Sequence, residues 1–244
     1  MPPSSASEPE ESLGFDEVWN RIQPIPGWLK EAQARLLWDA ATALPTGSVV
    51  LEIGSHQGRS TVVLGEAVRP RGGTVIAVDP FVDGVMFGGA STRAKFESNV
   101  MAFDLGDIVE LVPDYSTKLR RGWDRPFAML YIDGKHDYWT VSDDLRWSVH
   151  LPPGAAVIVH DSFSSIGVTL GLLRHVFLSR TVAYEGRSDS QAMFRVRRPT
   201  RADRVALLRQ LPWWLRNVGL KVLLRLRLRA VARLLGHDSV YDPY

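Results

Sequence analysis

The chain has 244 residues, of which 45% are hydrophobic and 23% charged, as expected of a globular protein with a sizeable core. It contains no cysteine, so disulfides, thiolate zinc sites and cysteine nucleophiles are excluded. The net charge of +2 is uneven, because residues 200–244 carry nine Arg or Lys and three Asp, which leaves a balance of −4 for the rest. We therefore expect no nucleic-acid partner for the main domain.

Composition divides the chain into three parts. Residues 1–13 are polar and acidic, which predicts a disordered leader and not a secretory signal. Residues 14–199 are predicted to form an α/β domain, and residues 200–244 a basic amphipathic helical tail. No run of 18 apolar residues occurs, so we expect no membrane-spanning helix.

The main domain begins with helical sequence over Phe15–Leu44, which Pro24, Pro26 and Gly27 divide into two helices. Apolar strand-like runs then alternate with stretches of helical length, and two further runs flank a polar turn. We therefore expect a doubly wound, mostly parallel seven-stranded α/β sheet of Rossmann-like type with an antiparallel edge hairpin. The predicted strands are Ser48–Ile53, Thr74–Val78, Ile108–Val112, Ala128–Ile132, Ala155–His160, Thr181–Tyr184 and Ala192–Val196. The predicted helices between them include Ser60–Val68, Thr92–Phe103 and Tyr138–His150.

The tail is predicted to be helical, with divisions at Pro212 and Gly219. At 100° per residue, one helix over Lys221–Leu235 is amphipathic. One side holds Val231, Leu224, Leu235 and Leu228, and the other holds Arg225, Arg229 and Arg233, with Arg227 as the exception. Such a helix binds an anionic membrane surface, or packs on its own domain or on a second subunit as a dimer element.

The stretch Val49–Asp79 reads as a strand–helix–strand unit in which Glu52 and Asp79 end the two strands. Ligands of open α/β sheets bind beyond the carboxyl ends of the strands. Gly54 and Gly58 lack a Cβ, so a ligand can approach their backbone, and Asp79 is placed to accept hydrogen bonds from a ribose diol. The alternative is a plain strand–helix turn without a ligand.

The glycine spacing departs from the Gly-x-Gly-x-x-Gly fingerprint of dinucleotide sites, which disfavours NAD-linked oxidoreduction. A wider turn with Ser55, His56 and Gln57 suits the amino-acid end of a zwitterionic ligand. We expect His56 to border that ligand.

Asp133 and Asp161 each end a strand-like run, 28 residues apart, so both carboxylates are expected in one crevice. Two hard oxygen ligands suit Mg²⁺, which could lower the pKa of a bound hydroxyl. His136 follows closely and is a candidate general base. The alternatives are that the two acids cap helices and that His136 packs against Trp139 or Tyr138. Strand alternation directs His160 away from Asp161, as a hydrogen-bonded core histidine.

These segments resemble a known family. The stretch VLEIGSHQGRST followed by AVD resembles motifs I and II of class I S-adenosylmethionine (SAM) methyltransferases. With PGWLKEAQARLLWDAA and YIDGKHDYWTVSDDLRWSVHLPPGAAVIVHDS, the likeness extends to the methyltransferase domain 24 family, which includes metal-dependent sugar O-methyltransferases. It covers roughly residues 15–198.

The resemblance implies a SAM-dependent enzyme with a methyltransferase domain over residues 14–199. It implies His136 and Asp133 as catalytic residues and Asp133 and Asp161 as metal ligands. The residues that it places around SAM are Glu52, Gly54, Ser55, Gly58, Ser60, Asp79, Ser116 and Asp133. Catechol-type relatives have Asn or an acid where this chain has Ser162, so a third metal ligand stays open; Asp137 lies nearby, and Asp143 and Asp144 could face solvent.

The segment Phe81–Thr92 is a candidate acceptor loop, because its glycines imply mobility and Phe81, Met86 and Phe87 could close over a substrate. The alternative is an ordinary surface loop.

The predicted function is SAM-dependent, Mg-assisted O-methylation of a hydroxyl on a sugar or glycolipid-type acceptor. The expected location is cytoplasmic and peripheral on the inner face of the membrane, and a homodimer is open. One alternative is an O-methyltransferase of a small phenolic or polyketide metabolite. Another is a membrane-associated SAM-binding module without catalysis.

Overall fold

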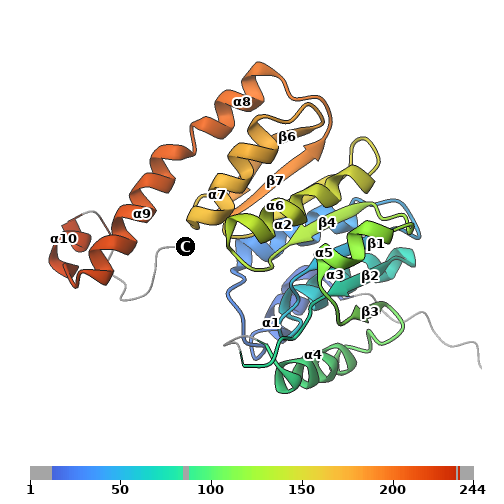
Figure 1. The fold of residues 1–244 in the computed structure, drawn as a ribbon. Helices are drawn as coiled ribbons and strands as arrows, with labels where there is room; N and C mark the ends of the chain where they lie inside the picture. The colour runs from blue at the N-terminus through green and yellow to red at the C-terminus, as the bar shows by residue number, and fades with distance from the viewer. Residues whose placement is uncertain (1–12, 85–87, 235, 237–244) are drawn as a thin grey trace, which may run out of the picture.

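The computed structural model describes residues 13–84, 88–234 and 236. Figure 1 shows a twisted sheet covered by helices on both faces, with a helical arm at the C-terminal end. The strands are β1 (Val49–Ile53), β2 (Thr74–Val78), β3 (Val109–Val112), β4 (Met129–Ile132), β5 (Ala156–Val159), β6 (Val182–Ser188) and β7 (Gln191–Val196). The helices are α1 (Phe15–Arg21), α2 (Glu31–Thr42), α3 (Arg59–Val68), α4 (Ala90–Ala102), α5 (Ser116–Leu119), α6 (Tyr138–Leu145), α7 (Ile166–Leu172), α8 (Arg201–Leu208), α9 (Leu211–Arg225) and α10 (Arg229–Leu234).

The seven strands lie in the order β3-β2-β1-β4-β5-β7-β6, and β7 alone runs against its neighbours. This confirms the predicted doubly wound sheet with an antiparallel edge pair. In the parallel part, Ile53 pairs with both Val78 and Ile132, and Ile132 pairs with Val159. The carboxyl ends of β1, β2, β4 and β5 therefore lie level at one edge of the sheet.

Strand alternation divides the core into two layers. Val50, Val75 and Met129 face a layer built with α1 to α4. Leu51, Ile76 and Leu130 face a second layer, to which α6 and α7 contribute. Because the central strands are buried on both faces, they read as continuous apolar runs, which is why the sequence predicts them well.

Three details differ from the predictions. Strand β6 continues to Ser188, which pairs with Gln191, so only two residues form the hairpin turn. The tail is not one helix over Lys221–Leu235, because α9 ends at Arg225 and Arg227 has a φ of +60° before α10 begins. The predicted division at Pro212 is present, because α8 ends at Leu208 and α9 begins at Leu211, with Pro212 in its first turn, where a missing N–H is harmless. The predicted division at Gly219 is absent, because Gly219 lies inside α9.

Several predictions fall on residues outside the described ranges. The leader prediction concerns residues 1–13, of which only Leu13 is described, and Met86 and Phe87 of the candidate acceptor loop are not described. Within the described part of the chain, helices long and apolar enough to cross a bilayer are absent.

Candidate active site

The turn after β1 packs directly on the end of β4. Gly54 has a φ of +87°, and a Cβ there would lie 2.3 Å from the carbonyl oxygen of Asp133. Gly58, with a φ of +86°, begins α3, and its Cβ would meet the Phe96 ring at 3.2 Å. Packing against β4 excludes a Cβ at Gly54, and at Gly58 the left-handed φ and the nearby Phe96 ring disfavour one. These reasons lie in the protein itself and differ from the predicted approach of a ligand.

Glu52 of β1 fixes this turn through hydrogen bonds to the helix that follows it. Its side chain is fully buried and accepts hydrogen bonds of 2.5 Å from the hydroxyls of Ser60 and Thr61 in α3. Burial raises the pKa of the Glu52 carboxyl to about 7, although the hydroxyls oppose this shift. Glu52 and Ser60, both predicted to contact SAM, therefore bind each other and hold α3 on β1. Ser55 of the same turn is also buried.

Asp79 lies at the end of β2 and remains partly exposed. One carboxylate oxygen accepts hydrogen bonds from the backbone N–H groups of Ser55 (3.0 Å) and His56 (2.9 Å), and the other from that of Phe81 (2.9 Å). A carboxylate offers about four acceptor positions. Asp79 thus organises the glycine turn and keeps acceptor capacity towards solvent, as the ribose prediction requires.

Phe81, the first apolar residue of the candidate acceptor loop, does not face an acceptor. It is buried in the first core layer and packs edge-on against Phe96 with 6.0 Å between ring centroids. The prediction that Phe81 closes over a substrate was therefore wrong.

Ser116 and Asp144 form a buried pair beside the end of β4. The Ser116 hydroxyl donates a 2.5 Å hydrogen bond to Asp144 Oδ1, and the expectation that Asp144 faces solvent was wrong. Burial raises the pKa of Asp144 to about 7. The missed signal is its place on the apolar face of α6, three residues after Val141 and one before Leu145.

Asp133, His136 and Asp161 come together as the sequence predicted. His136 Nδ1 lies 3.1 Å from Asp161 Oδ2, and His136 Nε2 lies 3.6 Å from Asp133 Oδ1. The His136 side chain is 45% exposed, whereas that of Asp161 is buried. The Tyr131 hydroxyl donates to the other oxygen of Asp133 at 3.2 Å.

The alternatives for these residues are not what the structure shows. The N-cap of α6 is Asp137, which accepts from the N–H groups of Trp139 and Thr140, and the N-cap of α7 is Ser165. The rings of Tyr138 and Trp139 pack edge-on against each other. Gly167 of α7 lies so close to the His136 carbonyl that a Cβ would come within 2.3 Å, so α7 fixes the loop that carries His136.

His160 was predicted to be a core histidine, but the structure places it in the candidate site. It is buried and hydrogen-bonded as expected, but it does not point away from the acids. Its Nδ1 lies 3.2 Å from Asp133 Oδ1 and 3.7 Å from Asp161 Oδ1, and its Nε2 lies 3.4 Å from Gln33 Oε1. Gln33 Oε1 also accepts from the Lys30 N–H, so His160 Nε2 must be the donor to it.

The two histidines and the two acids favour each other's charged forms. Burial alone would lower the pKa of His160, but Asp133 and Asp161 outweigh it and raise that pKa well above its usual range. Burial likewise opposes the ionised form of Asp133, yet the two histidines hold its pKa well below the ordinary value. The pKa of His136 is raised because the carboxylates outweigh its partial burial. Asp161 itself has a φ of +53°, a strained backbone of the kind that gathers at functional sites.

The predicted Mg²⁺ ion does not fit this arrangement of donors. The carboxylate oxygens face His136, His160, Tyr131 and Ser164, and the Ser162 hydroxyl is buried and donates to the Val159 carbonyl. Across residues 13–84, 88–234 and 236, no three His, Asp or Glu side chains are arranged to hold a metal ion. The metal prediction thus lacks support from the geometry, and we derive no step through a metal.

The order of the sheet, the glycine turn after β1 and the acids at the ends of β2, β4 and β5 are those of the class I methyltransferase fold. Comparison with known proteins agrees. A family model described as a methyltransferase domain, number 24 of that series, matches residues 51–162.

Solved structures show the same fold. An O-methyltransferase from Bacillus cereus in complex with SAH is 20% identical, with a TM-score of 0.54 over 75% of this chain and 90% of that one. The O-methyltransferase TomG from Streptomyces achromogenes, in complex with SAM, is 18% identical, with a TM-score of 0.54 over 75% and 87%. The SAH-bound methyltransferase PaMTH1 from Podospora anserina is 12% identical, with a TM-score of 0.60 over 75% and 87%.

The matched residues 51–162 are a little under half of the chain. In this part the chain is similar to methyltransferase domains, and the solved structures show that it shares their fold.

Proposed function

We propose that the protein methylates a hydroxyl oxygen and that His136 is the general base. The observation that carries this proposal is the 3.1 Å contact between His136 Nδ1 and Asp161 Oδ2, on a side chain that is half-exposed at the carboxyl edge of the sheet. An ionised carboxylate only accepts hydrogen bonds, so Asp161 selects the tautomer that carries its proton on Nδ1. Nε2 is then the basic nitrogen.

The protein's part in the reaction is positioning and proton removal. Bound SAM supplies a methyl group by in-line displacement, in which the new O–CH₃ bond forms as the C–S bond breaks. The hydroxyl proton passes to His136 Nε2. Asp161 and Asp133 then stabilise the imidazolium, because their carboxylates lie 3.1 Å and 3.6 Å from its two nitrogens. His160 offsets the charge that the two acids otherwise concentrate in one place.

SAM is proposed to lie along the carboxyl ends of β1, β2 and β4. Asp79 is the ribose partner, since its carboxylate is partly exposed beside the glycine turn. Ser116 is proposed to mark the adenine side, where the Ser116–Asp144 pair adjoins Gly134. Glu52 and Ser60 support the SAM site indirectly, because the hydrogen bond between them fixes the glycine turn.

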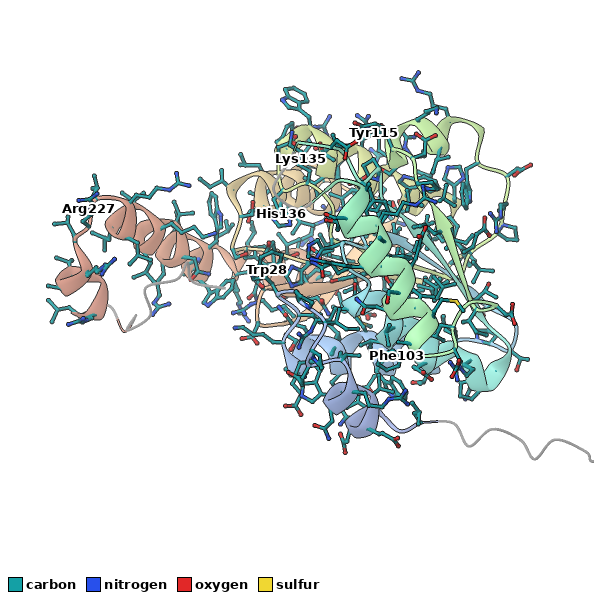
Figure 2. The ribbon with its side chains drawn as sticks, turned by 90° about the horizontal axis from the view of Figure 1, so that it is seen from below. Trp28, Phe103, Tyr115, Lys135, His136 and Arg227 are labelled. Atoms are coloured by element: carbon teal, nitrogen blue, oxygen red, sulfur yellow. The ribbon has the colours of Figure 1, made fainter. Side chains whose placement is uncertain are left out.

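The proposed acceptor is a sugar-type hydroxyl. The segment before α2 brings an exposed Trp28 ring to 5.8 Å from the His56 ring, next to the glycine turn. The His56 ring in turn lies near Asp133, whose charge acts on the pKa of that ring; Trp28 and His136 are labelled in Figure 2. An indole face is a suitable platform for the C–H face of a sugar ring, which would bring a hydroxyl towards His136. We expect Trp28→Ala to raise KM for a sugar acceptor by about tenfold with little change in kcat, and Trp139→Ala, at another exposed indole, to change neither.

The direct test is incubation of the protein with methyl-labelled SAM and a glycan and lipid extract of the source cell, followed by identification of the labelled product. A base-stable methyl ether on a sugar is the expected result. A label on a phenolic oxygen would favour the small-metabolite alternative, and a label on nitrogen or carbon would contradict the O-methylation proposal. Absence of label with full SAM binding would favour the non-catalytic module.

A further inference from the structure

The C-terminal arm, defined as Leu211–Leu234 with helices α9 and α10, is attached to the body along one side only. The Arg187 guanidinium lies 4.0 Å from the centroid of the Trp213 ring, and Asn217 Nδ2 donates to the Phe163 carbonyl at 3.3 Å. Leu220 is fully buried. Trp213, Asn217 and Leu220 follow helical spacing, so they form the inner face of α9.

The outer face of the arm is apolar as well. Leu215, Val222 and Leu226 recur at helical spacing on the side of α9 opposite the inner face. The short α10 and the turn before it continue this face. The side chains involved, each 42% to 86% exposed, are Leu215, Val222, Leu226, Leu228, Val231 and Leu234. Figure 1 shows α9 and α10, in red, projecting from the body beyond α7.

Positive charge surrounds this apolar face. Residues 211–234 contain six Arg or Lys and no Asp or Glu. The turn at Arg227, where φ is +60°, places this residue at the outer end of the arm, as Figure 2 shows. The exposed arginines are Arg216, Arg225, Arg227, Arg229 and Arg233, and Lys221 is partly exposed. Most of the positive charge of the arm therefore lies near exposed leucines.

We propose that the outer face of the arm binds the surface of an anionic lipid bilayer. Exposed leucines would enter the boundary between headgroups and acyl chains, and the arginines would meet the anionic headgroups. A second copy of the chain is a poorer partner. Two-fold pairing through this face would bring two sets of six cations together, with no acid on either arm to offset them.

The attachment of α9 gives this surface a relation to the candidate site. Asn217 is bonded to Phe163, two residues after Asp161. An arm held at a bilayer therefore keeps the site's rim close to the lipid surface, so that a membrane-borne acceptor could reach it. This last step rests on the proposed function, whereas bilayer binding by the arm does not.

Vesicle flotation of the full-length protein tests the proposal. We compare phosphatidylcholine vesicles with vesicles containing about one third phosphatidylglycerol, and expect binding only to the second kind, weakened by salt. Each arginine near an anionic surface contributes a factor of about five, so Arg225→Gln/Arg229→Gln/Arg233→Gln should lower the partition coefficient about a hundredfold. The matched control Arg121→Gln/Arg174→Gln/Arg180→Gln removes three exposed charges from the body and should leave it within about threefold.

A second set of variants tests the apolar face. Leu215→Ser/Val222→Ser/Leu226→Ser should abolish flotation, whereas Met101→Ser/Val149→Ser/Leu178→Ser, at exposed apolar positions of the body, should not. Stabilisation by SAM in thermal melts shows that each variant is folded, independently of turnover. Equal flotation of arm and control variants would overturn the proposal. So would a wild-type protein that does not float but sediments as a dimer that the leucine variants dissociate.

Discussion

At the scale of single residues, the proposed chemistry depends on four side chains that act as one cluster. Asp133, His136, His160 and Asp161 alternate acid and imidazole at distances of 3.1 to 3.7 Å. A basic nitrogen is useful only if its tautomer is fixed and its cation is stabilised. In this cluster the Asp161 carboxylate fixes the tautomer of His136, and the carboxylates of Asp133 and Asp161 together stabilise its cation.

The activity of this cluster should depend on pH in a defined direction. The base must be neutral, and the pKa of His136 is raised because the carboxylates outweigh burial. Thus kcat/KM should rise with pH through a pKa above 6.5, the ordinary value of histidine. In Asp161→Asn one of these charges is removed, so the rising limb should move to lower pH while the plateau falls. A limb in the same place in both proteins would show that another group limits the rate.

Asp144 makes a prediction about stability. Its pKa is raised from 3.8 to about 7 by burial, so between these values the folded protein binds a proton that the unfolded chain has lost. Wild-type stability therefore declines as pH rises through this window. Asn does not titrate, so the stability of Asp144→Asn relative to wild type should grow by up to about 1.4 kcal/mol per pH unit. Urea unfolding from pH 4 to 8 measures this, and a constant difference would contradict it.

At the scale of elements, the turn between β1 and α3 is held by close backbone packing. Gly54→Ala forces a side chain into a φ of +87° and against the Asp133 carbonyl. Strain and overpacking together should lower the free energy of unfolding by about 2–6 kcal/mol. The control is Gly72→Ala, with a φ of +62° and open space around its Cβ, which should cost only about 1 kcal/mol. If urea unfolding shows that the two variants lose similar free energies of unfolding, then Gly54 is needed only for its positive φ and not for its contact with β4.

Most elements could be predicted from the sequence because apolar runs and breakers are local signals. The strand ends at Ile53, Val78 and Ile132 were predicted, and with them the positions of Asp79 and Asp133. His160 was misjudged for a physical reason. Strand alternation assumes a regular pleat, but β5 ends at Val159, and Asp161 takes a left-handed φ, so both side chains turn to the same site. The bond to Gln33 joins residues 127 positions apart, a distance that no local pattern reports.

At the scale of the whole molecule, charge separates the domain from the arm. The sequence correctly located the basic segment, but its form depends on tertiary packing. The inner face of α9 is fixed by Trp213 and Asn217, which leaves the other leucines outside, and the turn at Arg227 redirects the arginines.

The charge of Asp133 and Asp161 could be balanced by a bound Mg²⁺ ion or by the two histidines, and removal of metal ions distinguishes the two. With both carboxylates paired to histidines, we expect removal of divalent ions by EDTA to change SAM affinity and turnover by less than about twofold. Calorimetry of SAM binding and turnover, each with and without added Mg²⁺, checks this. Loss of turnover in EDTA that Mg²⁺ restores would show that the metal assignment from the sequence was right.

The most direct test of the central proposal compares wild type with His136→Ala in methyl transfer and in SAM binding. General base catalysis contributes about 10²–10⁴ in rate, so kcat/KM for the acceptor should fall by at least about a hundredfold. His136 does not hold the glycine turn, so calorimetric SAM affinity should stay within about twofold. Turnover within about tenfold of wild type in His136→Ala would contradict the assignment of His136 as the base.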